Sequence, residues 1–133
     1  MGEGHAASAA ALWAGLSLLI LLGLSARVVR LRQKHGVATG DGGVEELGSA
    51  IRAHGNAAEY IPAGIAGLGI LALAGAPLLI VHLAGAALVV GRVLHAVGLS
   101  LSLGASRLRA AGMVLTWIAF LFMAVALLVF SLI

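Results

Sequence analysis

Two stretches without any charged side chain, each long enough to cross a lipid bilayer, constrain this chain more than any other feature. Residues 6–26 form the first stretch and residues 110–133 form the second. A helix rises about 1.5 Å per residue, so about 20 apolar residues cross the hydrocarbon core. Two further apolar segments lie between them, at 44–74 and 77–100. The pattern predicts an all-α integral membrane protein, a bundle of four transmembrane helices.

The composition supports the same class of protein. Hydrophobic residues make up 62% of the 133 residues and charged residues only 10%, which is far from the balance of a soluble domain. Four membrane spans use nearly the whole chain, so we expect one transmembrane domain over residues 1–133. The sequence contains no cysteine, which excludes disulfides and a cysteine nucleophile. Any thiol chemistry here requires a thiol that a ligand brings in.

The basic residues indicate the orientation in the membrane. The net charge of +3 could suggest a nucleic-acid partner, but most basic side chains flank the two connections that lie on one side of the predicted membrane. They are Arg27, Arg30, Arg32, Lys34 and Arg52 around the first connection, and Arg107 and Arg109 in a turn expected at 101–109. Basic loops face the cytoplasm, so we expect both termini outside it and no nucleic-acid partner. A signal peptide is disfavoured because Glu3 precedes the first apolar segment.

An unusual polar stripe begins the second apolar segment, within residues 52–62. Arg52, Asn56 and Glu59 are spaced i, i+4 and i+7, which places them on one face of a helix. An ionised carboxylate at this depth costs free energy unless a positive charge pairs with it. Arg52, or an arginine of a neighbouring helix, is the expected counter-charge. One hypothesis is therefore a structural ion pair that fixes the register of the helices.

The second hypothesis is a ligand-binding surface, because the topology gathers further polar residues near the same membrane face. These residues are Arg30, Arg52, Asn56, Glu59, Arg92, His95, Arg107 and Arg109. A carboxylate binds an ammonium group, guanidinium groups bind carboxylates, and an amide can do either. The set suits a peptide-like ligand with one amine and two acids, such as glutathione. A guanidinium of Arg107 or Arg109 near the ligand sulfur would favour the reactive thiolate.

The histidines do not predict a metal site. The five histidines are scattered, and none lies four residues from another, so no pair has the spacing of helical metal ligands. His82 is expected to be structural. His54, within the polar stripe's segment, is either an interfacial side chain or a ligand contact.

The segment Arg-Ala-His-Gly-Asn-Ala-Ala-Glu-Tyr-Ile-Pro at residues 52–62 resembles the second-helix signature of the MAPEG family, the membrane-associated proteins of eicosanoid and glutathione metabolism. Residues 29–34 and 91–95 are similar to segments of its prostaglandin E synthase branch. The resemblance covers nearly the whole chain. It implies a four-helix subunit that forms a homotrimer, with glutathione bound between adjacent subunits near the cytoplasmic side.

The resemblance also implies roles for single residues. Arg52, Asn56 and Glu59 would hold the backbone of glutathione, with Glu59 on its amine, and Arg109 or Arg107 would stabilise the thiolate. Further positions on or near family contacts are Arg30, His54, Tyr60, Arg92 and His95. Leu99 and Met113 stand near positions where members with defined eicosanoid activity carry tyrosines, so the resemblance does not carry eicosanoid specificity with it. The Ala/Gly/Leu-rich composition favours a bacterial member, in the inner membrane.

The sequence therefore predicts a glutathione-dependent transferase or peroxidase that acts on lipophilic electrophiles arriving through the bilayer. A different class of function is a small proton-coupled multidrug exporter, in which Glu59 carries the proton. The cations near Glu59 disfavour this alternative, since they keep the carboxylate ionised. A MAPEG-like scaffold without catalysis is the third hypothesis, and the missing tyrosines suggest it.

Overall fold

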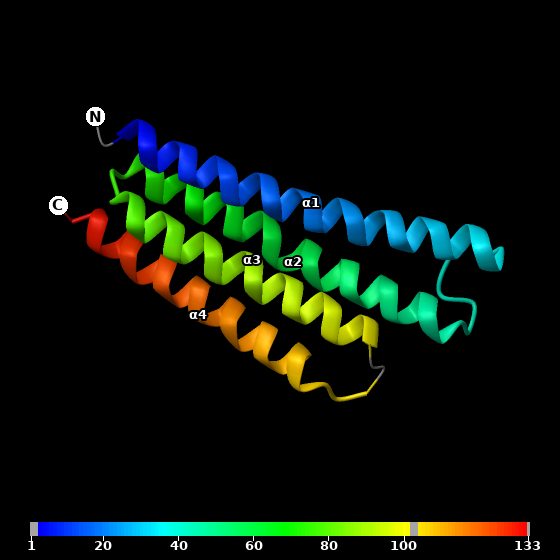
Figure 1. The fold of residues 1–133 in the computed structure, drawn as a ribbon. Helices are drawn as coiled ribbons and strands as arrows, with labels where there is room; N and C mark the ends of the chain where they lie inside the picture. The colour runs from blue at the N-terminus through cyan, green and yellow to red at the C-terminus, as the bar shows by residue number, and fades with distance from the viewer. Residues whose placement is uncertain (1–2, 102–103, 133) are drawn as a thin grey trace.

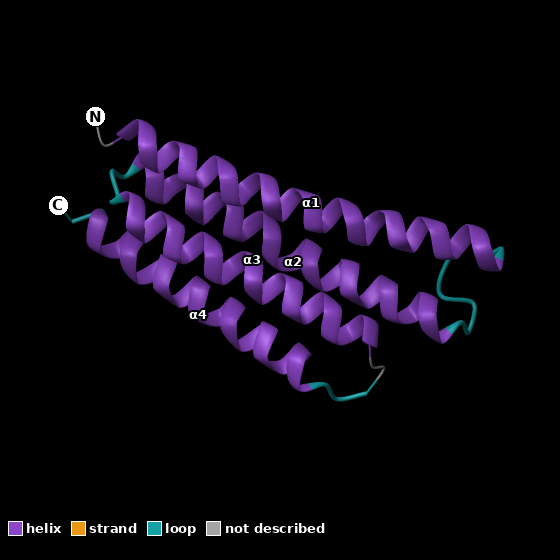
Figure 2. Cartoon of the chain, viewed as in Figure 1, coloured by secondary structure: helices purple, strands orange, loops and turns teal. Residues whose placement is uncertain are grey.

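The fold is a bundle of four long helices. The computed structural model describes residues 3–101 and 104–132, and its helices are α1 (Glu3–His35), α2 (Glu45–Leu73), α3 (Leu78–Leu101) and α4 (Arg107–Phe130) (Figure 1). The described residues contain no strand (Figure 2), which confirms the all-α class. All four helices are long and apolar enough to cross a membrane.

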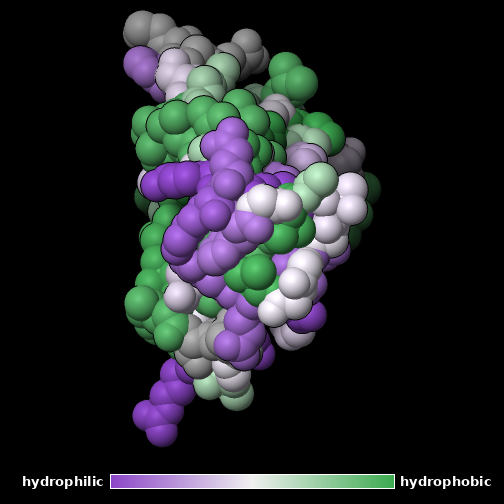
Figure 3. All heavy atoms as spheres, turned by 90° about the vertical axis from the view of Figure 1, so that its right-hand side faces the viewer, coloured by the Kyte–Doolittle hydropathy of each residue, from purple (hydrophilic) through white to green (hydrophobic). Residues whose placement is uncertain are grey.

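The helices are arranged so that α2 and α3 lie between α1 and α4. Within the described residues α1 contacts α2 and α3, α4 contacts the same two helices, and α1 does not contact α4. The α1–α2 and α3–α4 connections lie at one end of the bundle (Figure 1). Hydrophilic residues gather at this end (Figure 3), which we call the polar end. The two connections and the basic helix ends that flank them thus share one side, as predicted; that this side faces the cytoplasm stays a prediction.

Helix α1 continues well beyond the apolar segment 6–26. Arginine, glutamine and lysine are good helix formers, so the basic run extends the helix as far as His35. It ends at Gly36, whose φ of +65° is a conformation that glycine adopts without cost. The N–H of Val37 then donates to the carbonyl of Arg32 at 3.0 Å, which closes the helix end.

Helix α4 begins earlier than the sequence indicated. Ser106 is extended, with φ of −124° and ψ of 133°, and the helix starts at Arg107. The prediction of a turn over residues 101–109 is therefore wrong in its last part, while residues 102–103 lie outside the described residues. Arg107 and Arg109 lie in the first turn of α4, where their positions are fixed by the helix.

Glycines bring the backbones of α3 and α4 together. A Cβ atom on Gly91 would lie 2.7 Å from Oγ1 of Thr116 and 3.0 Å from the carbonyl oxygen of Gly112. Small residues permit this close approach between helices in a membrane. The contact fixes the register of α3 against α4, and with it the relative positions of their polar side chains.

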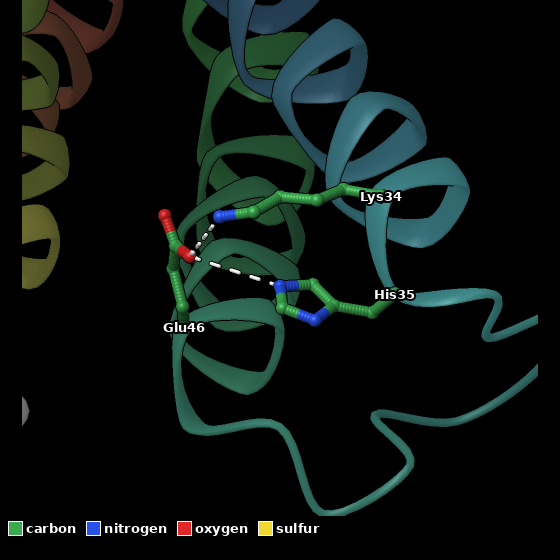
Figure 4. Close-up of polar contacts among 3 residues, drawn as sticks. All are labelled: Lys34, His35 and Glu46. Atoms are coloured by element: carbon green, nitrogen blue, oxygen red, sulfur yellow. Dashed lines mark ion pairs between the residues drawn. The ribbon is translucent and has the colours of Figure 1, made fainter.

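Polar contacts join α1 to α2 at the polar end. Glu46 Oε2 lies 3.5 Å from Nζ of Lys34 and 3.9 Å from Nε2 of His35 (Figure 4). The side chain of Lys34 is 62% exposed and that of Glu46 is 50% exposed. Solvent therefore screens these ion pairs, and they contribute little to stability.

Candidate functional site

A buried arginine is the centre of the polar cluster. The side chain of Arg92, on α3, is only 2% exposed. Its Nε donates to Oγ1 of Thr116 on α4 at 3.0 Å, and its Nη1 donates to Oδ1 of Asn56 on α2 at 2.6 Å. One guanidinium therefore connects three helices.

The partners of Arg92 are neutral. Its Cζ lies 5.0 Å from the ring centre of Tyr60, within the range of a cation–π interaction. Nη2 is buried and has no hydrogen-bond partner among the described residues. A delocalised guanidinium is more weakly hydrated than an ammonium group, which lowers the cost of burying it here. Arg92 nevertheless keeps one donor that the protein does not use.

Two open cavities adjoin this cluster on the side of α2. The first has a volume of about 280 Å³ and is lined by Arg52, Gly55, Asn56 and Glu59. The second has a volume of about 380 Å³ and is lined by Asp41, Glu45, Gly48, Ser49, Arg52, Leu99 and Arg109. Because Arg52 lines both, we call them the Arg52 cavities. They place three carboxylates, an amide and two guanidinium groups around adjoining spaces.

The predicted ion pair between Arg52 and Glu59 is wrong. Among residues 3–101 and 104–132, the carboxylate that forms salt bridges is that of Glu46. Arg52 and Glu59 are seven residues apart, which separates their backbones by about 10 Å along the helix, and both side chains are exposed. The structure thus gives no support to a register-fixing pair, and it leaves Glu59 open at the surface of α2.

The two candidate arginines at the start of α4 differ in position. Arg109 lines a cavity together with Arg52, and its backbone packs against Gly98 of α3. Arg107 is exposed and lines neither of the Arg52 cavities. Of the two arginines, Arg109 is the one that lines a cavity together with Arg52.

The remaining predicted residues lie at varying distances from this centre. His95 is buried on α3, one turn after Arg92. His54 is half-buried on α2, and Arg30 is exposed on α1; neither lines the Arg52 cavities. The structure of one chain thus brings Arg52, Asn56, Glu59, Tyr60, Arg92 and Arg109 together and leaves Arg30 and His54 apart.

Sequence reasoning missed two buried hydroxyl groups near the polar cluster. Thr116 is fully buried; besides accepting from Arg92, it donates to the carbonyl of Gly112 at 2.8 Å. Ser49 donates to the carbonyl of Leu99 at 2.6 Å and joins α2 to α3. A hydroxyl within an otherwise apolar span is the sequence signal that could have indicated Thr116. Hydroxyl side chains in membrane-spanning helices form hydrogen bonds with neighbouring helices.

His82 lies at the other end of the bundle and takes no part in the site. Its Nδ1 accepts a hydrogen bond from Nε1 of Trp13 at 3.0 Å, and the two rings meet edge to face. This contact joins α1 to α3. It is consistent with the structural role expected for His82.

The four apolar helices define a small multi-pass integral membrane protein. Its polar site consists of a buried arginine and the charged side chains at the polar end of the bundle. The MAPEG family model matches residues 10–129, and the chain belongs to the MAPEG family. It is 47% identical over 116 residues to inner membrane protein YecN of Escherichia coli K12, a match that covers 87% of each chain. The protein of the same name from Escherichia coli O6:H1 gives the same values. That name states a membrane location and no activity.

Proposed function

We propose that this protein is a glutathione-dependent transferase or peroxidase of a bacterial inner membrane, acting on small lipophilic electrophiles. The observation that carries the proposal is the set of charged and amide side chains around the Arg52 cavities. Membership of a family named for eicosanoid and glutathione metabolism supports it.

Arg52, Asn56 and Glu59 carry groups that can bind those of glutathione, whereas Asp41 and Glu45 add two further carboxylates to the second cavity. The carboxylate of Glu59 accepts hydrogen bonds from the α-amine. Arg52, which borders both cavities, binds a carboxylate of the ligand. The second cavity, at about 380 Å³, has the size of a small-molecule site, and the first, at about 280 Å³, adjoins it through Arg52. A glutathione that extends from Glu59 past Arg52 brings its central cysteine, which carries the thiol, toward Arg109.

Arg109 is the residue that stabilises the thiolate in this proposal. A guanidinium near the sulfur favours the ionised form, which is the nucleophile. In conjugation, the sulfur forms a bond to the electrophilic carbon and the leaving group departs with its electron pair. In peroxide reduction, the sulfur attacks one oxygen, the O–O bond breaks, and the alkoxide takes a proton. A second thiol then converts the sulfenic acid to a disulfide and water.

The exposed position of the stripe supports a homotrimer, the assembly that the family resemblance implies. Arg52 and Glu59 are exposed on the single chain, within a helix long enough to cross the membrane. Charged side chains facing lipid are costly. A second copy of the chain against this face of α2 would remove that cost and enclose the cavities.

Calorimetric titration of the purified protein with glutathione tests the proposal. Wild type should bind, and Glu59→Gln should weaken binding by about 10-fold or more, since a hydrogen bond to a charged group contributes about 1.5–3 kcal/mol. Glu46→Gln is the matched control, because Glu46 lies outside the Arg52 cavities. Absence of binding by wild type, or unchanged binding by Glu59→Gln, contradicts the proposal.

The two arginines provide a second test. Arg109→Ala should lose the ultraviolet absorbance of bound thiolate and the turnover of an aryl halide and an organic hydroperoxide. Arg107→Ala should keep both. If wild type binds glutathione but turns over neither substrate, the non-catalytic scaffold is the better hypothesis.

A further inference from the structure

The buried arginine determines which way the amide of Asn56 is turned. A guanidinium has donors and no acceptor, so the atom of Asn56 that lies 2.6 Å from Nη1 of Arg92 is the oxygen Oδ1. The nitrogen Nδ2, with its two N–H groups, is the atom left for other partners. Asn56 also lines the cavity that it shares with Arg52 and Glu59.

Thr116 holds the guanidinium in this orientation. Its hydroxyl donates to the carbonyl oxygen of Gly112, with 2.8 Å between the two oxygen atoms. This leaves the lone pairs of Oγ1 directed toward Nε of Arg92. Thr116 cannot move aside, because it is fully buried against the Gly91 contact between α3 and α4. With Nε held, the plane of the guanidinium is held, and Nη1 stays directed at Asn56.

We propose that Thr116 is a positioning residue which, through Arg92, makes Asn56 a hydrogen-bond donor to the ligand. This inference rests on the proposed function and specifies its ligand contacts. An ionised Glu59 is an acceptor and Arg52 is a donor, so the cavity offers one acceptor and two donors. The ligand therefore places its amine at Glu59 and a carboxylate or amide carbonyl oxygen at Asn56.

Asn56→Asp tests the orientation directly. The new carboxylate can still accept from Arg92, but it presents oxygen to the cavity in place of N–H. Glutathione binding should weaken by about 10-fold or more. Gln33→Glu, the same change of amide to acid at an exposed position on α1, should leave binding unchanged. If Asn56→Asp binds glutathione as well as wild type or better, Asn56 accepts from the ligand amine and the inference is wrong.

Thr116→Val and Thr116→Ser test the positioning role. Valine keeps the shape without the acceptor, and serine keeps the hydroxyl, so binding should fall by about 10-fold in the first and stay within about 2-fold in the second. In an Asn56→Asp background, Thr116→Val should have no further effect, because its action passes through Asn56. An equal loss in both backgrounds would show that Thr116 acts through packing alone.

A measurement without ligand separates this inference from the proposed function. Asn56 is the sole asparagine in the sequence, so protein labelled with ¹⁵N-asparagine gives one side-chain NH₂ signal. Its chemical shift should change in Thr116→Val and stay close to wild type in Thr116→Ser. An unchanged signal in Thr116→Val overturns the relay even if glutathione binds. Failure of wild type to bind glutathione overturns the proposed function, whereas the signal still tests the relay.

Discussion

Gly98→Ala should impair catalysis by displacing Arg109 without altering its chemistry. A Cβ atom at position 98 would lie 2.9 Å from Cα of Arg109 and closer still to its backbone nitrogen. Backbone cannot rotate away as a flexible side chain can, so the first turn of α4 has to move. Restoring an ordinary contact of 3.4 Å to that Cα requires a shift of about 0.5 Å or more.

The size of that shift sets the expected effects. Overpacking of this kind costs about 1–3 kcal/mol of stability, which leaves a folded protein with a lower unfolding temperature. A misplacement approaching 1 Å at a reacting group can reduce the rate by about 100-fold. Glutathione affinity should change much less, because Glu59 and Asn56 lie on α2.

The assay compares kcat, glutathione affinity and thermal unfolding in detergent for Gly98→Ala and a matched control. Gly69→Ala is the control, since a Cβ atom there meets nothing within 4 Å; alanine should stabilise that helix slightly. Wild-type kcat and stability in Gly98→Ala would refute the reasoning, because they would mean that α3 and α4 do not approach so closely at Arg109. An equal loss of kcat in both variants would also refute it.

Three further predictions concern two interhelical hydrogen bonds and the exporter hypothesis. Trp13→Phe removes the hydrogen bond to His82 and should lower stability by about 1–2 kcal/mol, measured by thermal unfolding, with glutathione binding unchanged. Ser49→Ala leaves the carbonyl of Leu99 without its 2.6 Å donor and should cost about 1 kcal/mol. Proteoliposomes with an imposed pH gradient should show no substrate flux that depends on Glu59; flux that Glu59→Gln abolishes would favour the exporter.

The membrane spans and their order could be predicted because bilayer thickness sets the minimum length of each apolar segment. The apolar segments 44–74 and 77–100 correspond closely to α2 and α3. The start of α4 was missed because Arg107 and Arg109 were assigned to a loop on the basis of their charge, although arginine is also a good helix former. Charge indicates the side of the membrane, and it says little about where a helix begins.

The sequence predicts which residues gather at the polar end, but it predicts their mutual geometry only within one helix. The spacing of Arg52, Asn56 and Glu59 gives their common face directly. The partner of Asn56 depends on the register of α3 against α2, and the role of Thr116 depends on the register of α3 against α4. The register of α3 against α4 follows from close backbone contacts at glycines, and on α2 Gly64 packs against the side chain of Leu88 on α3; a single sequence specifies neither contact.

Burial of Arg92 also has a consequence for biogenesis. An arginine within a membrane-spanning helix opposes insertion into the bilayer, and α3 is synthesised before α4. The hydroxyl that holds Nε of Arg92 belongs to Thr116, close to the middle of the last helix. Newly made α3 therefore carries an incompletely satisfied cation until α4 arrives. Truncated chains that lack α4 are expected to be unstable and susceptible to proteolysis. Only chains that contain the last helix can then accumulate in the membrane.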